Sequence, residues 1–225
     1  MVQFRSAILI IWILCCRQIS AAQDSPFSIF PFGSYTTSSK LFHHSSDPDP
    51  ALRNAFIPID NIFHGGIEVI RSFQSIQLQL GISIEYISRM NETTEMNNQS
   101  IPVSVKNGYY AIPIECTGYF YLPFDLERVR FFIGGGGGVY LGGRVYAYHG
   151  VYSTAGQLIP GAGVHVLSGA DVILRYGIVL RSSVKFRDIN FHSIDRWTGN
   201  FTTEELHSRI NIDGMTVTVG LLFQL

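Results

Sequence analysis

The stretch from Arg128 to Tyr148, RVRFFIGGGGGVYLGGRVYAY, alternates along its whole length between two kinds of residue. One register is apolar or glycine, and the other holds arginine, tyrosine, phenylalanine and glycine. Because successive side chains of a strand point to opposite faces, the pattern predicts one long strand with an apolar face. Soluble strands usually have about 5–6 residues. Strands that cross a bilayer at a tilt have about 9–11 and are apolar toward lipid, so this stretch favours a membrane-spanning strand.

The composition agrees with a barrel wall rather than with a soluble surface. Charged residues make up 15% of the chain and glycine accounts for 22 of 225 residues, whereas about 25% charged residues is typical of soluble proteins. The length suits one all-β domain. After residue 22 no segment reaches 18 consecutive apolar residues, so the pattern offers no helical membrane span there.

The N-terminal segment Met1–Ala22 predicts a secretory signal peptide. Arg5 gives it a positive start, Ala7–Cys16 is a short apolar core, and Ser20-Ala21-Ala22 supplies small residues before a cleavage site. An uncleaved anchor helix is the alternative. The barrel domain would then occupy residues 23–225, with Cys116 as its one cysteine and therefore no intramolecular disulfide. Acidic residues outnumber basic ones, which argues against nucleic-acid binding.

Seven further segments are expected to be strands, and most of them show the same two-residue alternation. The expected strands lie at Gln23–Thr36, Ile59–Arg71, Ile76–Met90, Gly108–Leu122, Pro160–Ser168, Val172–Asp188 and Arg209–Leu225. Pro113 falls inside the fourth expected strand and predicts a local bulge there, because proline cannot donate to the ladder.

The connections between these strands alternate between long and short. Long polar loops are expected at 37–58, 91–107, 149–159 and 189–208, and short turns at 72–75, 123–127 and 169–171. This alternation predicts an all-β fold, an eight-stranded antiparallel up-and-down transmembrane β-barrel. An even number of strands places both termini at the short-turn end.

The predicted inward face gathers most of the charge of the barrel. We expect a lumen charge network made of Glu68, Glu85, Glu115, Arg128, Arg130, Arg144, His165, Arg175, Arg181, Lys185 and Arg187. Because an eight-stranded barrel is only wide enough for its own side chains, these groups should pair and fill the lumen. The excess of bases over acids leaves a narrow anion-attracting pore open as an alternative. The glutamates could also resemble a hydrolase pair, but we do not expect an enzyme.

The C-terminal sequence from Thr218 to Leu225, TVGLLFQL, resembles the assembly signal that ends bacterial outer-membrane proteins. Thr218, Gly220 and Phe223 match its polar, glycine and hydrophobic positions, and Leu225 stands where phenylalanine is usual. With the glycine-rich strand, the chain resembles the small outer-membrane β-barrel family that includes the OmpA barrel and OmpW-like proteins. The resemblance covers roughly residues 25–225.

The resemblance implies the outer membrane of a Gram-negative bacterium, with loops extracellular and termini periplasmic. It also implies contact with outer-membrane lipid, and barrel-assembly machinery and periplasmic chaperones as partners during biogenesis. A structural or surface-interaction role and an OmpW-like channel for small anionic or hydrophobic solutes both fit such a barrel.

Three other interpretations of the sequence remain. A soluble lipocalin-like barrel would reverse the two faces, with the apolar side inside. The adjacent His43 and His44 fall in an expected loop without further ligands at a recognisable spacing, so we expect no metal site. Gly134–Gly138 lies inside a strand and lacks the residues of a phosphate-binding loop. We therefore expect no cofactor, and we expect these glycines to leave room for bulky inward neighbours.

Overall fold

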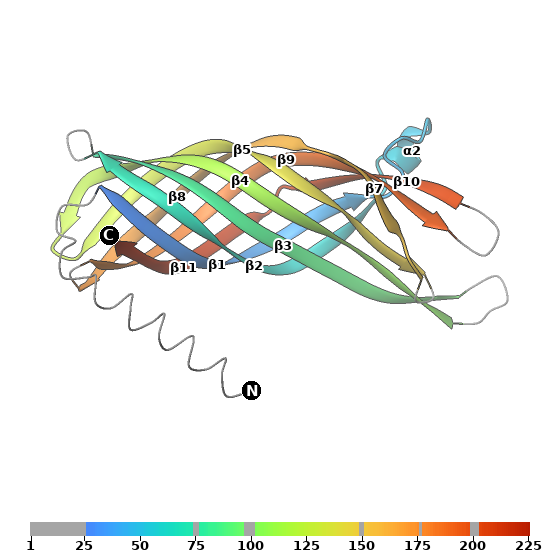
Figure 1. Cartoon of the computed structure of the whole chain (residues 1–225), viewed down its shortest axis with the longest axis horizontal. Helices are drawn as coiled ribbons and strands as arrows, with labels where there is room; N and C mark the ends of the chain where they lie inside the picture. Colours follow the sequence, from blue (N-terminus) through green and yellow to red (C-terminus); the bar gives the residue numbers. More distant parts are fainter. Residues whose placement is uncertain (1–25, 74–76, 97–101, 149–150, 176, 199–202) are drawn as a thin grey trace.

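The computed structural model describes residues 26–73, 77–96, 102–148, 151–175, 177–198 and 203–225, and these form a closed antiparallel β-barrel (Figure 1). Its elements are β1 (Phe27–Phe42), α2 (Pro50–Arg53), β2 (Phe56–Phe73), β3 (Leu78–Met96), β4 (Pro102–Leu126), β5 (Val129–Tyr148), β6 (Val151–Tyr152), β7 (Thr154–Ile159), β8 (Gly161–Arg175), β9 (Ile178–Thr198), β10 (Thr203–Ile212) and β11 (Met215–Gln224). The predicted signal peptide lies outside the described residues.

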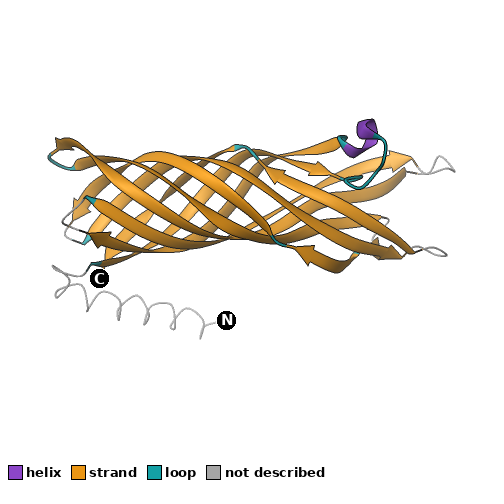
Figure 2. Cartoon of the chain, turned by 90° about the horizontal axis from the view of Figure 1, so that it is seen from above, coloured by secondary structure: helices purple, strands orange, loops and turns teal. Residues whose placement is uncertain are grey.

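Eight strand positions close the ring in chain order, as the sequence predicted. β7 and β8 follow each other in one position and are separated by Pro160, and β10 and β11 share another and are separated by Asp213 and Gly214. β1 pairs with β2 on one side and with β10 and β11 on the other, which closes the wall. The strands are tilted and cross behind one another in Figure 2. None of the helices in the described part of the chain is long and apolar enough to cross a membrane.

We call the part of the barrel toward the short turns and the C-terminus the lower part, and the part toward the long loops the upper part. The lower part carries an apolar outer belt. Its side chains face outward and are exposed, among them Ile67, Val69, Ile82, Ile84, Ile133, Val164, Val166, Phe186 and Val219. On β9 the belt runs from Ile178 to Phe186, about the number of residues that one tilted strand needs to cross a bilayer. Ile82 is 65% exposed, whereas the inward Arg181 is 1% exposed. These orientations contradict the lipocalin-like arrangement for this part of the barrel.

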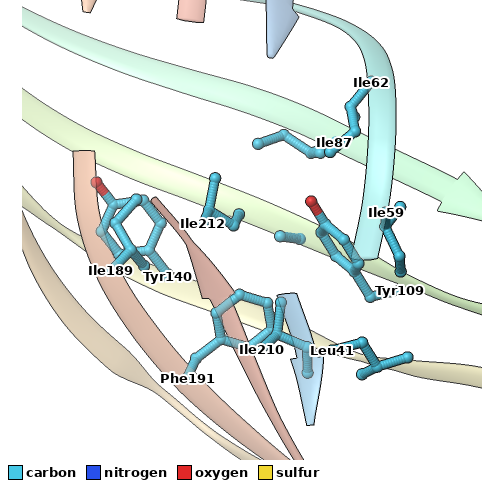
Figure 3. Close-up of a cluster of buried hydrophobic side chains, with 11 residues drawn as sticks. Leu41, Ile59, Ile62, Ile87, Tyr109, Tyr140, Ile189, Phe191, Ile210 and Ile212 are labelled. Atoms are coloured by element: carbon cyan, nitrogen blue, oxygen red, sulfur yellow. The ribbon is translucent and has the colours of Figure 1, made fainter. Parts of the chain in front are cut away.

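The upper part, toward the long loops, has the opposite arrangement, with an apolar interior. Its core consists of Leu41, Ile59, Ile62, Ile87, Tyr109, Ala111, Tyr140, Ile189, Phe191, Ile210 and Ile212 (Figure 3). Outside this core the wall is mixed, with Asp60, Asn190 and Asp213 exposed as well as Phe56 and Leu158. The sequence analysis missed this core because it assigned much of the region to loops.

The ring of backbone pairing opens along two seams at this height. β3 pairs with β2 only from Leu78 to Tyr86, and β5 pairs with β8 only as far as Tyr140. Among the described residues the upper wall therefore forms two sheets, β3-β4-β5-β6 and β2-β1-β10-β9-β7. The apolar core fills the space between them, as in a β-sandwich.

Four sequence-based expectations about the strands are wrong. Three of the expected long loops are partly strand, because β1 and β2, β3 and β4, and β9 and β10 extend into them. The fourth expected loop contains β6 and β7. The expected turn 169–171 lies inside β8, which ends at Arg175. The strand expected to begin at Pro160 begins earlier, because β7 precedes Pro160 in the same place of the ring.

The fourth concerns Pro113, which causes no bulge. β4 keeps one register with β3, from Ile84↔Ile114 to Ile87↔Ala111, and pairs through Pro113↔Tyr140 with β5. The missing N–H is therefore accommodated by leaving one short stretch of the β3 ladder unpaired.

Candidate functional site

The interior of the lower barrel holds a cluster of ion pairs between facing walls. Lys185 and Arg187 come from β9, whereas Glu85 and Glu115 come from β3 and β4 on the far side of the ring. Lys185 Nζ lies 2.7 Å from Glu115 Oε2, Arg187 Nη2 lies 2.5 Å from Glu85 Oε1, and Arg187 Nε lies 3.1 Å from Glu115 Oε1. We call these four residues the central ion cluster. All are buried, so the ion pairs compensate charges that would otherwise be costly to desolvate.

Two histidines and a tyrosine complete the cluster. His64 Nδ1 lies 3.3 Å from Glu85 Oε2, and its Nε2 lies 3.0 Å from Thr36 Oγ1. Tyr140 donates a 2.5 Å hydrogen bond to Glu115 Oε1. His165 Nε2 lies 2.9 Å from Thr117 Oγ1. Each carboxylate of the cluster therefore has a further polar side chain beside it as well as the lysine and arginine, which suits buried ions.

A second ion pair lies closer to the short-turn end. Arg181 donates from Nε and Nη2 to the two oxygens of Asp171, at 2.8 and 2.9 Å, and Tyr121 donates to the same carboxylate. The guanidinium also lies 4.9 Å from the ring centres of both Tyr119 and Phe132. This fork geometry and the surrounding rings hold the Arg181 side chain across the lumen.

Glu68 occupies the space between the two groups and accepts hydrogen bonds from Tyr119 Oη at 2.7 and 2.9 Å. Beside it is a small cavity lined by Phe30, Phe32, Glu68, Ser83, Tyr119, Leu167, Arg181, Ser183, Lys185 and Thr218. It has room for about one water-sized molecule. Arg181 Nη1 and Ser83 Oγ have no protein partner. A single water could satisfy both groups, and a larger solute would not fit.

The structure separates the predicted charge network into four groups. Glu68, Glu85, Glu115, His165, Arg181, Lys185 and Arg187 are buried in the lower interior. Arg144 is also buried, but above them, where it donates 2.6 and 3.4 Å hydrogen bonds to Asn107 Oδ1 and Ser208 Oγ and thereby ties the two upper sheets together. Arg130 is half-buried over the Tyr121 ring.

Arg128 and Arg175 lie outside this interior and are exposed at the short-turn end, so their assignment to the lumen is wrong. The sequence analysis also missed Asp171 and His64. Asp171 seemed to belong to a turn, although its place two residues after Gly169 continues the inward register of β8. With Asp171 added and two arginines removed, the excess of bases that suggested an anion pore largely disappears.

The four residues of the suspected assembly signal lie on or directly after β11. Thr218 faces inward and lies 2.8 Å from Ser34 Oγ. Gly220 faces the ring of Phe30, where a Cβ atom would come within 2.7 Å of Cε2. Phe223 is half-buried, and Leu225 follows the strand and is exposed. Part of this pattern therefore also serves packing inside the barrel.

His43 and His44 follow β1 at the long-loop end, with ring centres 4.4 Å apart. Burial, His44 and Arg144 lower the pKa of His43. Within the described residues, no group of three or more acidic, histidine or cysteine side chains could hold a metal ion.

Comparison with known proteins identifies the class through the fold alone. No family model matches the sequence, and no curated protein matches it. Among solved structures, the outer-membrane protein OprG of Pseudomonas aeruginosa aligns with a TM-score of 0.55 and 13% identity over 88% of this chain and 95% of that one. The Neisserial surface protein NspA aligns with a TM-score of 0.48 and 11% identity over 89% and 98%.

The attachment invasion locus protein Ail of Yersinia pestis aligns with a TM-score of 0.46 and 11% identity over 89% of this chain and 100% of that one. The chain thus has the fold of the small eight-stranded outer-membrane β-barrels, with OprG as the similarity that carries this conclusion.

Proposed function

We propose that this protein is an integral β-barrel of a Gram-negative outer membrane with a structural or surface-interaction role. The observation that carries the proposal is the continuous apolar belt, which surrounds the barrel at the height of the charged interior. A belt of exposed aliphatic side chains with ions inside is favourable in lipid and unfavourable in water. The long-loop end would be extracellular and the termini periplasmic.

The lumen would be closed to solutes in this proposal. The central ion cluster joins opposite walls, and the apolar core fills the space above it. Ion pairs across the lumen and apolar side chains above them would both obstruct a solute. The part of the barrel above the belt would then act through its outer surface and loops, in contact with a partner outside the cell.

Biogenesis would follow the usual course for such barrels. A signal peptide at Met1–Ala22 would direct export, and periplasmic chaperones and the barrel-assembly machinery would receive the chain through Thr218, Gly220, Phe223 and Leu225. Replacing Phe223 with serine should reduce insertion in cells more strongly than replacing the exposed Leu126 with serine. Normal insertion of the Phe223 variant would contradict the role of this signal.

Purified protein in detergent tests the membrane proposal. We expect the unheated protein to migrate differently from the heated protein on a gel, because a closed barrel resists unfolding by detergent. A chain that remains soluble and monomeric without detergent would contradict the proposal. Planar-bilayer recordings test the closed lumen: a steady anion current that disappears in Arg144→Ala and Arg181→Ala variants would favour a narrow channel instead.

A further inference from the structure

We propose that the short-turn end of the barrel carries a binding surface for the phosphate groups of anionic phospholipids, made of Arg71, Arg128 and Arg175. This inference rests on the proposed membrane location. We call these three residues the arginine rim. All three are exposed, and they come from three different strand positions at the same end of the barrel.

Arg71 lies on the lipid-facing side of β2. Its backbone neighbours are Phe27 on β1 and Leu80 on β3, both outward and exposed. The guanidinium lies 5.6 Å from the ring centre of Phe27 and 5.1 Å from that of Phe73, which is nearer the end of β2. The charge is therefore held by two aromatic rings at the margin of the apolar belt, the depth at which phosphates of a bilayer lie.

Arg128 and Arg175 come together on another part of the circumference. β5 and β8 are paired, and the N–H of Ile173 donates a 2.8 Å hydrogen bond to the carbonyl of Arg128. Arg175 lies opposite Ile178, a residue of the belt on β9. The backbone therefore brings Arg128 and Arg175 to neighbouring strand ends at the lower margin of the belt. A guanidinium presents a planar fork of donors that matches phosphate oxygens.

The balance of exposed charge differs between the two ends of the barrel. Among the described side chains, Glu127 is the exposed acid beside the three arginines at the short-turn end. At the long-loop end the exposed charges are mixed: Asp188 and Asp213 are exposed, Arg89 is exposed as well, and Lys40 is paired with Asp213 at 2.5 Å. The excess of bases at the short-turn end favours a negative lipid surface there.

Competition between spin-labelled lipids tests the proposal. The full mature chain is inserted into phosphatidylcholine vesicles, and the motionally restricted fraction of spin-labelled phosphatidylglycerol is compared with that of spin-labelled phosphatidylcholine. We expect the wild type to prefer phosphatidylglycerol by about fivefold, since one basic residue near a charged surface is worth a factor of that order. The preference should fall as the salt concentration rises.

The decisive variant is the triple change R71Q/R128Q/R175Q, which should lose the preference. The matched control R53Q/R89Q/R196Q removes three exposed arginines at the long-loop end and should keep it. The single change R71Q and the pair R128Q/R175Q show whether both parts of the rim contribute. Equal association of both lipids with the wild type, or an unchanged preference in the triple variant, would overturn the proposal.

Two further readouts identify the source of the phosphate and separate this inference from the proposed function. Excess inorganic phosphate should reduce the preference no more than sodium chloride of equal ionic strength, whereas selective loss would indicate a site for free phosphate and overturn the lipid proposal. Heat-modifiable migration in pure phosphatidylcholine shows insertion independently of lipid charge. A chain that inserts but shows no preference refutes the arginine rim alone, and a chain that does not insert into these vesicles refutes both.

Discussion

The two halves of β9 show how one strand can serve two environments. Below Arg187, its outward residues run from Ile178 to Phe186 and its inward residues include Arg181 and Lys185. Above Arg187, Ile189 and Phe191 point inward and are fully buried, while Asn190 points outward and is exposed. The alternation continues without a break, so only the chemistry of the two faces is exchanged.

On β2 the alternation of inward and outward side chains is interrupted where the two halves meet. The buried Ile59 and Ile62 are three residues apart, and Asp60 and Asn61 between them are both exposed. Asn61 has a φ of 57°, a left-handed conformation that asparagine tolerates better than most residues. In the proposed membrane location, the outward face is apolar where it meets lipid and more polar where it meets water. One margin of the membrane would then lie between Phe186 and Asp188.

The largest expected effect comes from breaking the central ion cluster in the lower half. Arg187→Ala would leave Glu85 and Glu115 to share Lys185 as their lysine or arginine partner, and should lower the free energy of unfolding by about 3–5 kcal/mol. Urea unfolding of the vesicle-inserted barrel, followed by gel migration, measures the change. Arg196→Ala, an exposed arginine of the same strand, serves as the control and should change the stability by less than about 0.5 kcal/mol.

A matched pair of arginine substitutions tests the exchange of faces directly. Ile82→Arg introduces a charge into the belt and should cost about 2–4 kcal/mol if that surface faces the bilayer midplane. Asn190→Arg introduces the same side chain on the outward face of the upper half and should cost less than about 0.5 kcal/mol. Equal effects of the two changes in vesicles would mean that the belt does not face lipid.

The sequence predicted the lower half well, because its signals are strong there. Clear alternation in β3, β5 and β9 identified the strands and the orientation of Glu85, Arg181 and Lys185. The upper half was harder, since a strand with polar residues outside and few apolar ones inside, such as Asn91–Met96, resembles a loop. A short stretch of Ser, Gly and Ala also suggested a turn at 169–171, whereas the chain reverses near Gly177, which has a φ of 78°.

The candidate site could be predicted as a set of residues but not as a set of contacts. Inward orientation follows from the alternation of each strand alone. The pairing of Arg187 with Glu85 depends on the relative heights of β9 and β3, which face each other across the ring and share no ladder. No local sequence pattern indicates how high one strand lies relative to a strand across the ring. Arg128 and Arg175 were misassigned because they lie next to turns, where side chains no longer alternate between the two faces of a strand.

A smaller effect should separate packing in the two halves. Ile210→Val removes one methylene group from the upper core and should cost about 0.5–1.5 kcal/mol, because the surrounding side chains cannot fill the space. Ile84→Val removes the same group from the lipid-facing belt, where acyl chains can adjust, and should cost less. Urea unfolding in vesicles compares them. A larger cost for Ile84→Val would contradict the assignment of the two surfaces.

The smallest expected effect is a pH dependence confined to the upper half. The folded protein lowers the pKa of His43 below its ordinary value of 6.5, through burial and the nearby His44 and Arg144. The unfolded chain therefore binds a proton at His43 more readily, so stability is fully present above about pH 6.5 and decreases as the pH falls below it. The protection factors of β10 amides, which are corrected for the intrinsic pH dependence of hydrogen exchange, should decrease between pH 7 and pH 5, while those of belt amides of β11 change little.

His43→Gln should weaken this dependence, because glutamine keeps polar contacts but cannot take up a proton. His207→Gln, at another half-buried histidine on β10, is the matched control and should retain it. If the His43 variant keeps the full pH dependence, another group governs it. If β11 amides respond as strongly as β10 amides, the two halves unfold as one unit. The exchange of faces at Asp188 would then mark a change of surroundings without a boundary in stability.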